Sequence, residues 1–187
     1  LSKNLKLKTL DCTFNPLNNL DVSYNIALTE LICERIGLYN LFLDRNEKLV
    51  KLDCTNNELS KLNLNKNTEL IDLKCTSNYI ESLNLENNTK LTSIDCKQNA
   101  IKDLDLCKNK EITYLNCSQN KLSNLNLENN PLITKLYISR NGEFKELKLA
   151  KDNKLDTLYC TYMGLEKLDL SNCNNLKELN CESNNLN

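Results

Sequence analysis

Leucine and isoleucine recur along the chain with a period of 21 residues. The residues that open each repeat unit are Leu7, Leu28, Leu49, Leu70, Leu91, Ile112, Ile133, Leu155 and Leu176. One interval, before Leu155, is 22 residues because one extra residue lies around Gly142–Glu143. A fixed period in the range of about 20–50 residues is typical of solenoids, in which each repeat forms one coil of a stack.

Each repeat divides into two similar halves. The first half has 10 residues and reads L-x-x-L-x-C-x-x-N-x, and the second has 11 and reads L-x-x-L-x-L-x-x-N-x-x. The alternation at positions four and six places two apolar side chains on one face of a short strand. Neither half is long enough for a helix of ordinary length. The pattern therefore predicts two short parallel β-strands per 21-residue coil, with little or no helix.

One coil cannot bury its own apolar side, so the coils must stack to form a continuous core. Equivalent strands then pair in parallel, roughly 4.8 Å apart. We expect residues 1–187 to form a single solenoid of about nine stacked coils. Both chain ends fall in the middle of a coil and show no polar cap, which solenoid ends need. The expectation is therefore a segment of a longer array, or coils that continue in a partner.

Asparagine fills most of the ninth positions in both halves. In the second halves the exceptions are Asp152 and Cys173. An asparagine side chain offers a hydrogen-bond donor and an acceptor. Because the backbone loses its ladder partners as it leaves a strand, stacked asparagines are expected to satisfy the polar groups of the turns.

Two first halves lack this asparagine. Ile36 and Met163 occupy the position instead, and each is followed by a glycine, Gly37 and Gly164. A third glycine, Gly142, follows Asn141 in the coil with the extra residue. We infer that the turn takes a different backbone path in these three coils.

Cysteine occupies the sixth position of most first halves. It stands at residues 12, 33, 54, 75, 96, 117, 160 and 181, and Ile138 replaces it once. Leucine takes the same place in most second halves, and a free cysteine behaves as a small apolar residue. The interpretation favoured here is a stacked row of buried thiols. Disulfides between coils are disfavoured because in-register side chains point the same way. Zinc is disfavoured because the chain has no C-x(2–4)-C pair and no histidine.

Two cysteines stand outside this row. Cys173 occupies a ninth position, so we expect it in a turn and largely covered. Cys107 follows the inward-facing Leu106 and should point outward. The register therefore predicts one readily accessible thiol, Cys107.

Composition argues against several functional classes. The net charge is −1 and the pI is near 5.7, so the chain has no basic field that would select nucleic acid. It contains no apolar run of about 18 residues, so no membrane insertion is expected in this segment. There is no histidine, no glycine-rich phosphate loop and no carboxylate pair that breaks the repeat. We therefore expect no enzyme activity and no cofactor. Calcium is disfavoured because the aspartates lack the known calcium-binding spacings.

Tyrosines gather on one outward face. Positions three, five and seven of the first halves point outward and are small or polar in the early coils. Coils six to eight carry Tyr114, Lys135, Tyr137, Arg140, Tyr159 and Tyr162. Tyrosine and arginine are enriched at binding hot spots, which makes these residues the candidate partner-binding face. The alternative is that tyrosine is simply a good strand residue. A smaller patch, Tyr39 and Phe42, lies on the opposite wall, which is otherwise polar.

The two half-repeat patterns resemble the leucine-rich repeat superfamily, and the nested 10 + 11 arrangement is similar to its bacterial 21-residue subclass called IRREKO. The resemblance covers essentially the whole chain and carries no catalytic residues. It implies a bacterial protein at the cell surface or secreted, which contacts a protein or glycan partner or mediates adhesion. The alternative is a structural stalk or spacer in a larger surface protein. Because the halves differ by one residue, we expect weak curvature.

Overall fold

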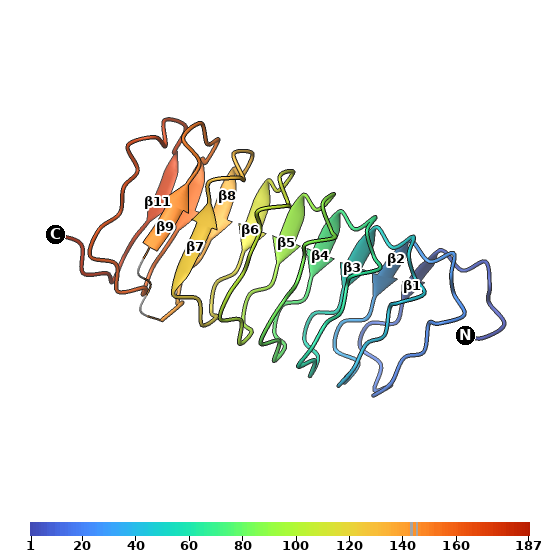
Figure 1. Cartoon of the computed structure of the whole chain (residues 1–187). Helices are drawn as coiled ribbons and strands as arrows, with labels where there is room; N and C mark the ends of the chain where they lie inside the picture. The colour runs from blue at the N-terminus through green and yellow to red at the C-terminus, as the bar shows by residue number, and fades with distance from the viewer. Residues whose placement is uncertain (143, 145) are drawn as a thin grey trace.

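A computed structural model describes residues 1–142, 144 and 146–187. Nine short strands form one parallel sheet. They are β1 (Thr9–Asp11), β2 (Glu30–Ile32), β3 (Lys51–Asp53), β4 (Asp72–Lys74), β5 (Ser93–Asp95), β6 (Tyr114–Asn116), β8 (Lys135–Tyr137), β10 (Thr157–Tyr159) and β11 (Glu178–Asn180). Each belongs to the first half of one coil. Figure 1 shows them side by side along an elongated stack, with the chain ends at opposite ends. The predicted parallel solenoid is confirmed, and the described residues contain no helix.

The second halves differ from the expectation of one strand each. Among the described residues, only β7 (Asn124–Leu127) and β9 (Glu146–Leu149) form a second ladder, in the coil that contains the extra residue and in the coil before it. The other second halves are closed by local turns. Asn67 N, for example, donates to Leu64 O over 3.0 Å. The outward residues of this wall are exposed, so water can satisfy the backbone groups that a ladder would otherwise pair. Glu143, at the predicted insertion, lies outside the described residues.

The core is a stack of identical layers. Leucine and isoleucine at positions one, four and six are almost completely buried in the inner coils, and burial of each contributes about 1.5–3 kcal/mol. Cysteines at the sixth position of the first halves pack in the same core, and all ten cysteines are free. The predicted row of buried thiols is confirmed, from Cys33 to Cys160. Cys173 is also buried, as expected.

The first-half asparagines join neighbouring coils. Asn78 Nδ2 donates to Cys54 O of the preceding coil (3.0 Å) and to Cys75 O of its own coil (3.1 Å). Its Oδ1 accepts from Leu59 N over 3.0 Å. The predicted role of these amides in the turns is confirmed. Ile36 replaces the asparagine in the second coil and offers no side-chain hydrogen bond. The asparagine of the next coil takes over, because Asn57 Oδ1 accepts from two backbone N–H groups, those of Ile36 and Leu38.

The second-half asparagines form a separate row. Asn88 Nδ2 donates to Leu64 O (3.0 Å) and Asn67 O (2.8 Å) of the preceding coil. In coil seven the register prediction was wrong. Asp152 is exposed, and Asn153 is buried in the turn instead, with its Nδ2 2.9 Å from Ala150 O. The extra residue shifts the turn by one position, and only the asparagine can satisfy the buried carbonyl.

A left-handed residue lies in the turn three residues after every first-half strand. The eighth position has φ between 52° and 59° in Phe14, Arg35, Asn56, Ser77, Gln98, Gln119, Arg140, Tyr162 and Ser183. The different path inferred at three coils is confirmed, because Gly37, Gly142 and Gly164 add a further positive φ. At Gly37 a Cβ atom would lie 2.5 Å from Asn18 Oδ1. Only glycine fits this turn without displacing its neighbour.

Candidate protein-binding face

Three tyrosines form a continuous row on the outer face of the nine-stranded sheet. Tyr114 lies on β6, Tyr137 on β8 and Tyr159 on β10, and we call them the tyrosine row. The ring centroids of Tyr114 and Tyr137 are 5.8 Å apart, and those of Tyr137 and Tyr159 are 5.2 Å apart. Tyr137 and Tyr159 stand directly opposite each other in the parallel register, whereas Tyr114 is opposite Lys135. Tilted rings at these distances attract one another, which gives a pre-ordered aromatic ridge.

The hydroxyls of Tyr159 and Tyr114 have raised pKa values. Tyr159 donates a hydrogen bond to Glu178 Oε1 on β11, and this bond raises the pKa of the phenol. Burial raises the pKa of Tyr114. Both groups therefore remain hydrogen-bond donors well above neutral pH.

Arg140 and Tyr162 form a pair at the rim of this face. The guanidinium carbon of Arg140 lies 4.7 Å from the centroid of the Tyr162 ring. The two residues occupy the left-handed turn positions after β8 and β10. Stacking on the ring orders the guanidinium while leaving its donors free to bind a partner.

A small hollow joins the row to the rim. Its volume is about 160 Å³. It is lined by Lys97, Asn116, Ser118, Gln119, Tyr137, Ser139, Arg140 and Tyr159. Small-molecule sites usually measure about 300–1,000 Å³, so this hollow suits a single side chain of a partner. Its mixed lining has two cations and several hydroxyl and amide groups.

The structure thus gathers most of the predicted residues. Tyr137, Tyr159 and Arg140 line the hollow, Tyr114 packs against Tyr137, and Tyr162 supports Arg140. Lys135 is exposed beside Tyr114. The sequence analysis did not identify the polar residues that coils five and six contribute to the hollow. These residues are Lys97, Asn116, Ser118 and Gln119. These occupy positions five, seven and eight, so extending the same register by one coil and by one position would have found them.

Cys107 lies on the other wall, half-exposed, in the turn after its second-half segment. Its Sγ donates to Asp105 Oδ2 over 3.6 Å, and this bond raises the pKa of the thiol. The prediction of a single accessible thiol was wrong, because Cys12 and Cys181, in the first and last coils, are half-exposed as well. In the described part of the chain, no group of three or more histidine, cysteine or carboxylate side chains could hold a metal ion.

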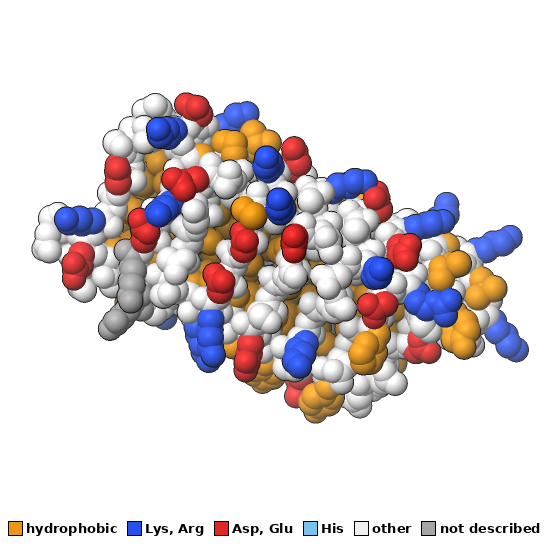
Figure 2. All heavy atoms as spheres, viewed as in Figure 1, with side chains coloured by type: hydrophobic (Ala, Val, Ile, Leu, Met, Phe, Trp, Pro, Cys, Tyr) orange, Lys and Arg blue, Asp and Glu red, His pale blue; other side chains and the backbone are white. Residues whose placement is uncertain are grey.

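Other aromatic side chains stand apart from the tyrosine row. Phe42 is 73% exposed and Tyr39 is 59% exposed, both on the wall opposite the sheet. Tyr79, 63% exposed, occupies the turn after β4 and was not predicted to matter. Figure 2 shows positive and negative side chains interspersed over the visible surface, in keeping with the net charge of −1. Residues 1–142, 144 and 146–187 include no helix long and apolar enough to cross a membrane.

Comparisons by sequence find no matching family profile and no matching curated protein. Comparisons by structure find several solved proteins of the same shape. The functional domain of InlJ from Listeria monocytogenes, described as including a cysteine ladder, is 28% identical with a TM-score of 0.81. The match covers 100% of this chain and 46% of that one. The shared architecture thus extends over every coil described above.

The structures of two further bacterial proteins, both with leucine-rich repeats, identify the fold class. A leucine-rich repeat protein of Leptospira interrogans has a TM-score of 0.77 at 19% identity, covering 98% of this chain and 56% of that one. The chain has a leucine-rich repeat fold. The leucine-rich effector YopM of Yersinia pestis is 25% identical with a TM-score of 0.69, covering 98% of this chain and 48% of that one. This leucine-rich repeat chain therefore spans about half the length of these three neighbours. The 21-residue IRREKO subclass stays a prediction.

Proposed function

We propose that this chain is a bacterial protein-binding scaffold, at the cell surface or secreted, that contacts its partner through the tyrosine row and its rim. The observation that carries the proposal is the hollow beside Tyr137, Tyr159 and Arg140. It presents aromatic and arginine side chains, which dominate binding hot spots, in an arrangement already ordered before binding. The description of YopM as an effector supports a role in contact with other proteins.

A structural stalk or spacer is the second candidate. One observation favours it: the rings of the tyrosine row already pack against each other, as strand residues do in any stable sheet. The mixed surface charge is also compatible with a segment that contacts nothing in particular. The two candidates differ in what happens when the row is removed.

The experiment begins by placing a photo-crosslinking amino acid at Lys135, which is exposed at the edge of the row. The partner identified in this way is then titrated against purified variants. Tyr137→Ala with Tyr159→Ala should weaken binding at least about tenfold, as expected for the loss of two hot-spot aromatic side chains.

The matched control is Tyr39→Ala with Phe42→Ala, which removes two aromatic rings from the opposite wall. The control should bind with unchanged affinity, and both double variants should keep a cooperative melting transition. Equal affinities for the wild type and the Tyr137/Tyr159 double variant would favour the stalk.

A further inference from the structure

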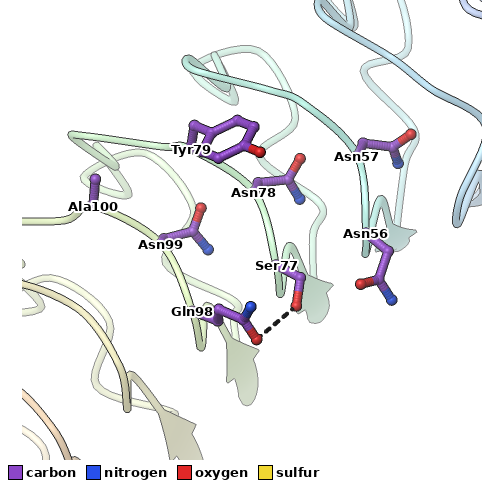
Figure 3. A pocket seen from close by; sticks show the side chains of 8 residues that line it. All are labelled: Asn56, Asn57, Ser77, Asn78, Tyr79, Gln98, Asn99 and Ala100. Atoms are coloured by element: carbon purple, nitrogen blue, oxygen red, sulfur yellow. Dashed lines mark hydrogen bonds between the residues drawn. The ribbon is translucent and has the colours of Figure 1, made fainter.

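A second groove runs along the turns that follow β3, β4 and β5. It has a volume of about 420 Å³, within the usual range for small-molecule sites. Its lining residues are Asn56, Asn57, Ser77, Asn78, Tyr79, Gln98, Asn99 and Ala100, and none of them is charged. Figure 3 shows them in three successive coils, with Asn57, Asn78 and Asn99 in a row and the Tyr79 ring beside them. This groove is separate from the tyrosine row.

The asparagine side chains of the inner row use both their donors and their acceptors within the protein. Asn99 Nδ2 donates to Cys75 O (2.9 Å) and Cys96 O (3.1 Å), and its Oδ1 accepts from Ile80 N (3.0 Å). The backbone amides are engaged as well, because Gln98 N donates to Ser118 O over 2.9 Å. A peptide that adds a strand needs free backbone donors and acceptors along an edge. The inner row therefore does not suit recognition of a peptide backbone.

The outer row is formed by the eighth-position side chains and keeps free groups. Ser77 Oγ donates to Gln98 Oε1 over 3.1 Å, which leaves the Gln98 Nε2 donors without a protein partner in the described part of the chain. Asn56 Nδ2 reaches Glu34 Oε1 over 3.3 Å and leaves its Oδ1 as a free acceptor. Amides and hydroxyls of this kind offer both donors and acceptors, which suits a neutral ligand rich in hydroxyl groups.

Tyr79 supplies the apolar surface that such a ligand needs. The side chain is 63% exposed, its ring lies along the groove in Figure 3, and Ala100 follows at the same position of the next coil. An exposed aromatic face binds the C–H face of a sugar ring, while a tyrosine hydroxyl stays in water. Equivalent positions recur roughly every 4.8 Å along the stack, a step comparable to one sugar unit of an extended chain.

We propose that this groove binds a linear neutral oligosaccharide, which stacks on Tyr79 and hydrogen-bonds to Asn56, Ser77 and Gln98. The lining has no cationic side chain that would bind an acidic polysaccharide, so a neutral chain fits it better. The site is distinct from the hollow of the proposed protein-binding face, because the two share no lining residue.

The test is a titration of the ¹⁵N-labelled protein, followed by amide chemical shifts. The probes are cellohexaose and chitohexaose, which separate plain hexose chains from N-acetylated chains. At least one sugar should shift the amides of Ser77, Tyr79 and Gln98 in a saturable way. Tyr79→Ala should raise the dissociation constant about tenfold. Gln98→Ala, which keeps a non-glycine residue at the positive φ, should weaken binding as well.

The matched control is Tyr24→Ala, which removes an exposed tyrosine from a different turn and should leave the dissociation constant unchanged. The proposal is overturned if neither sugar produces saturable shifts, or if Tyr79→Ala binds as tightly as the wild type. It is also overturned if an uncharged glycine-serine hexapeptide shifts the same amides and neither sugar does, because the groove would then bind a peptide. None of these outcomes bears on the Tyr137/Tyr159 double variant, so the two proposals fail separately.

Discussion

Individual cysteines in this chain act as apolar core residues. Burial raises the pKa of Cys96 to about 12, and it holds the pKa of Cys75 and Cys117 well above the ordinary value of 9.0. The cause is desolvation, since a thiolate in the stack would lose its water and gain no cation. At neutral pH the buried thiols are therefore fully protonated and unreactive.

This property predicts a loss of stability at alkaline pH. Because the pKa of Cys96 is raised on folding, its contribution is complete below about pH 9 and is lost as the pH rises towards 12. Between pH 8 and pH 10, a fully buried thiol of this kind lowers the free energy of unfolding by about 1.4 kcal/mol. Cys96→Ala should reduce the alkaline loss by that amount in denaturant titrations under reducing conditions.

Ile94→Val is the control for this measurement, since it also removes core volume from β5 but no thiol. It should lower stability equally at pH 8 and pH 10. The same alkaline loss in the wild type and in Cys96→Ala would contradict the interpretation of Cys96 as a buried neutral thiol.

At the scale of the strand and its turn, sequence predicts some features well and others poorly. The alternation of leucine and cysteine predicted every first-half strand, because inward side chains must be apolar. The positive φ at the eighth position was not predicted, since residues as different as Phe14, Gln98 and Tyr162 adopt it. There the backbone hydrogen bond to the next coil, such as Gln98 N to Ser118 O or Tyr162 N to Glu182 O, overrides local preference. The number of second-half ladders was not predictable either, because exposed backbone can bond to water instead.

The asparagine turns give a prediction at this scale. Asn78→Ala removes the amide that bonds Cys54 O, Cys75 O and Leu59 N, all within the stack. Leaving these buried groups unpaired should lower the free energy of unfolding by about 2–3 kcal/mol in urea titrations. Asn15→Ala is the matched control. Asn15 is exposed and bonds only Cys12 O and Thr13 O of its own coil, so its loss should be about 1 kcal/mol or less. Equal losses at the two positions would contradict a role in joining coils.

At the scale of the whole molecule, one register divides the chain into a buried stack and three accessible surfaces. These are the sheet face with the tyrosine row, the opposite wall, and the turns that bear Tyr79. Counting positions along the repeat was enough to place Tyr114, Tyr137 and Tyr159 on one face. It did not predict that Lys97 and Gln119 would border the same hollow. Such contacts depend on side-chain conformation across neighbouring coils, which a repeat pattern does not specify.

This division is the central claim, and the rate at which native thiols react tests it most directly. A chromogenic disulfide reagent at neutral pH should modify three thiols rapidly, those of Cys12, Cys107 and Cys181. The other seven should react only after denaturation, and they are Cys33, Cys54, Cys75, Cys96, Cys117, Cys160 and Cys173. Mass spectrometry of the labelled peptides identifies the fast sites. Rapid labelling of the inner row, Cys54 to Cys117, in the folded protein would contradict the account.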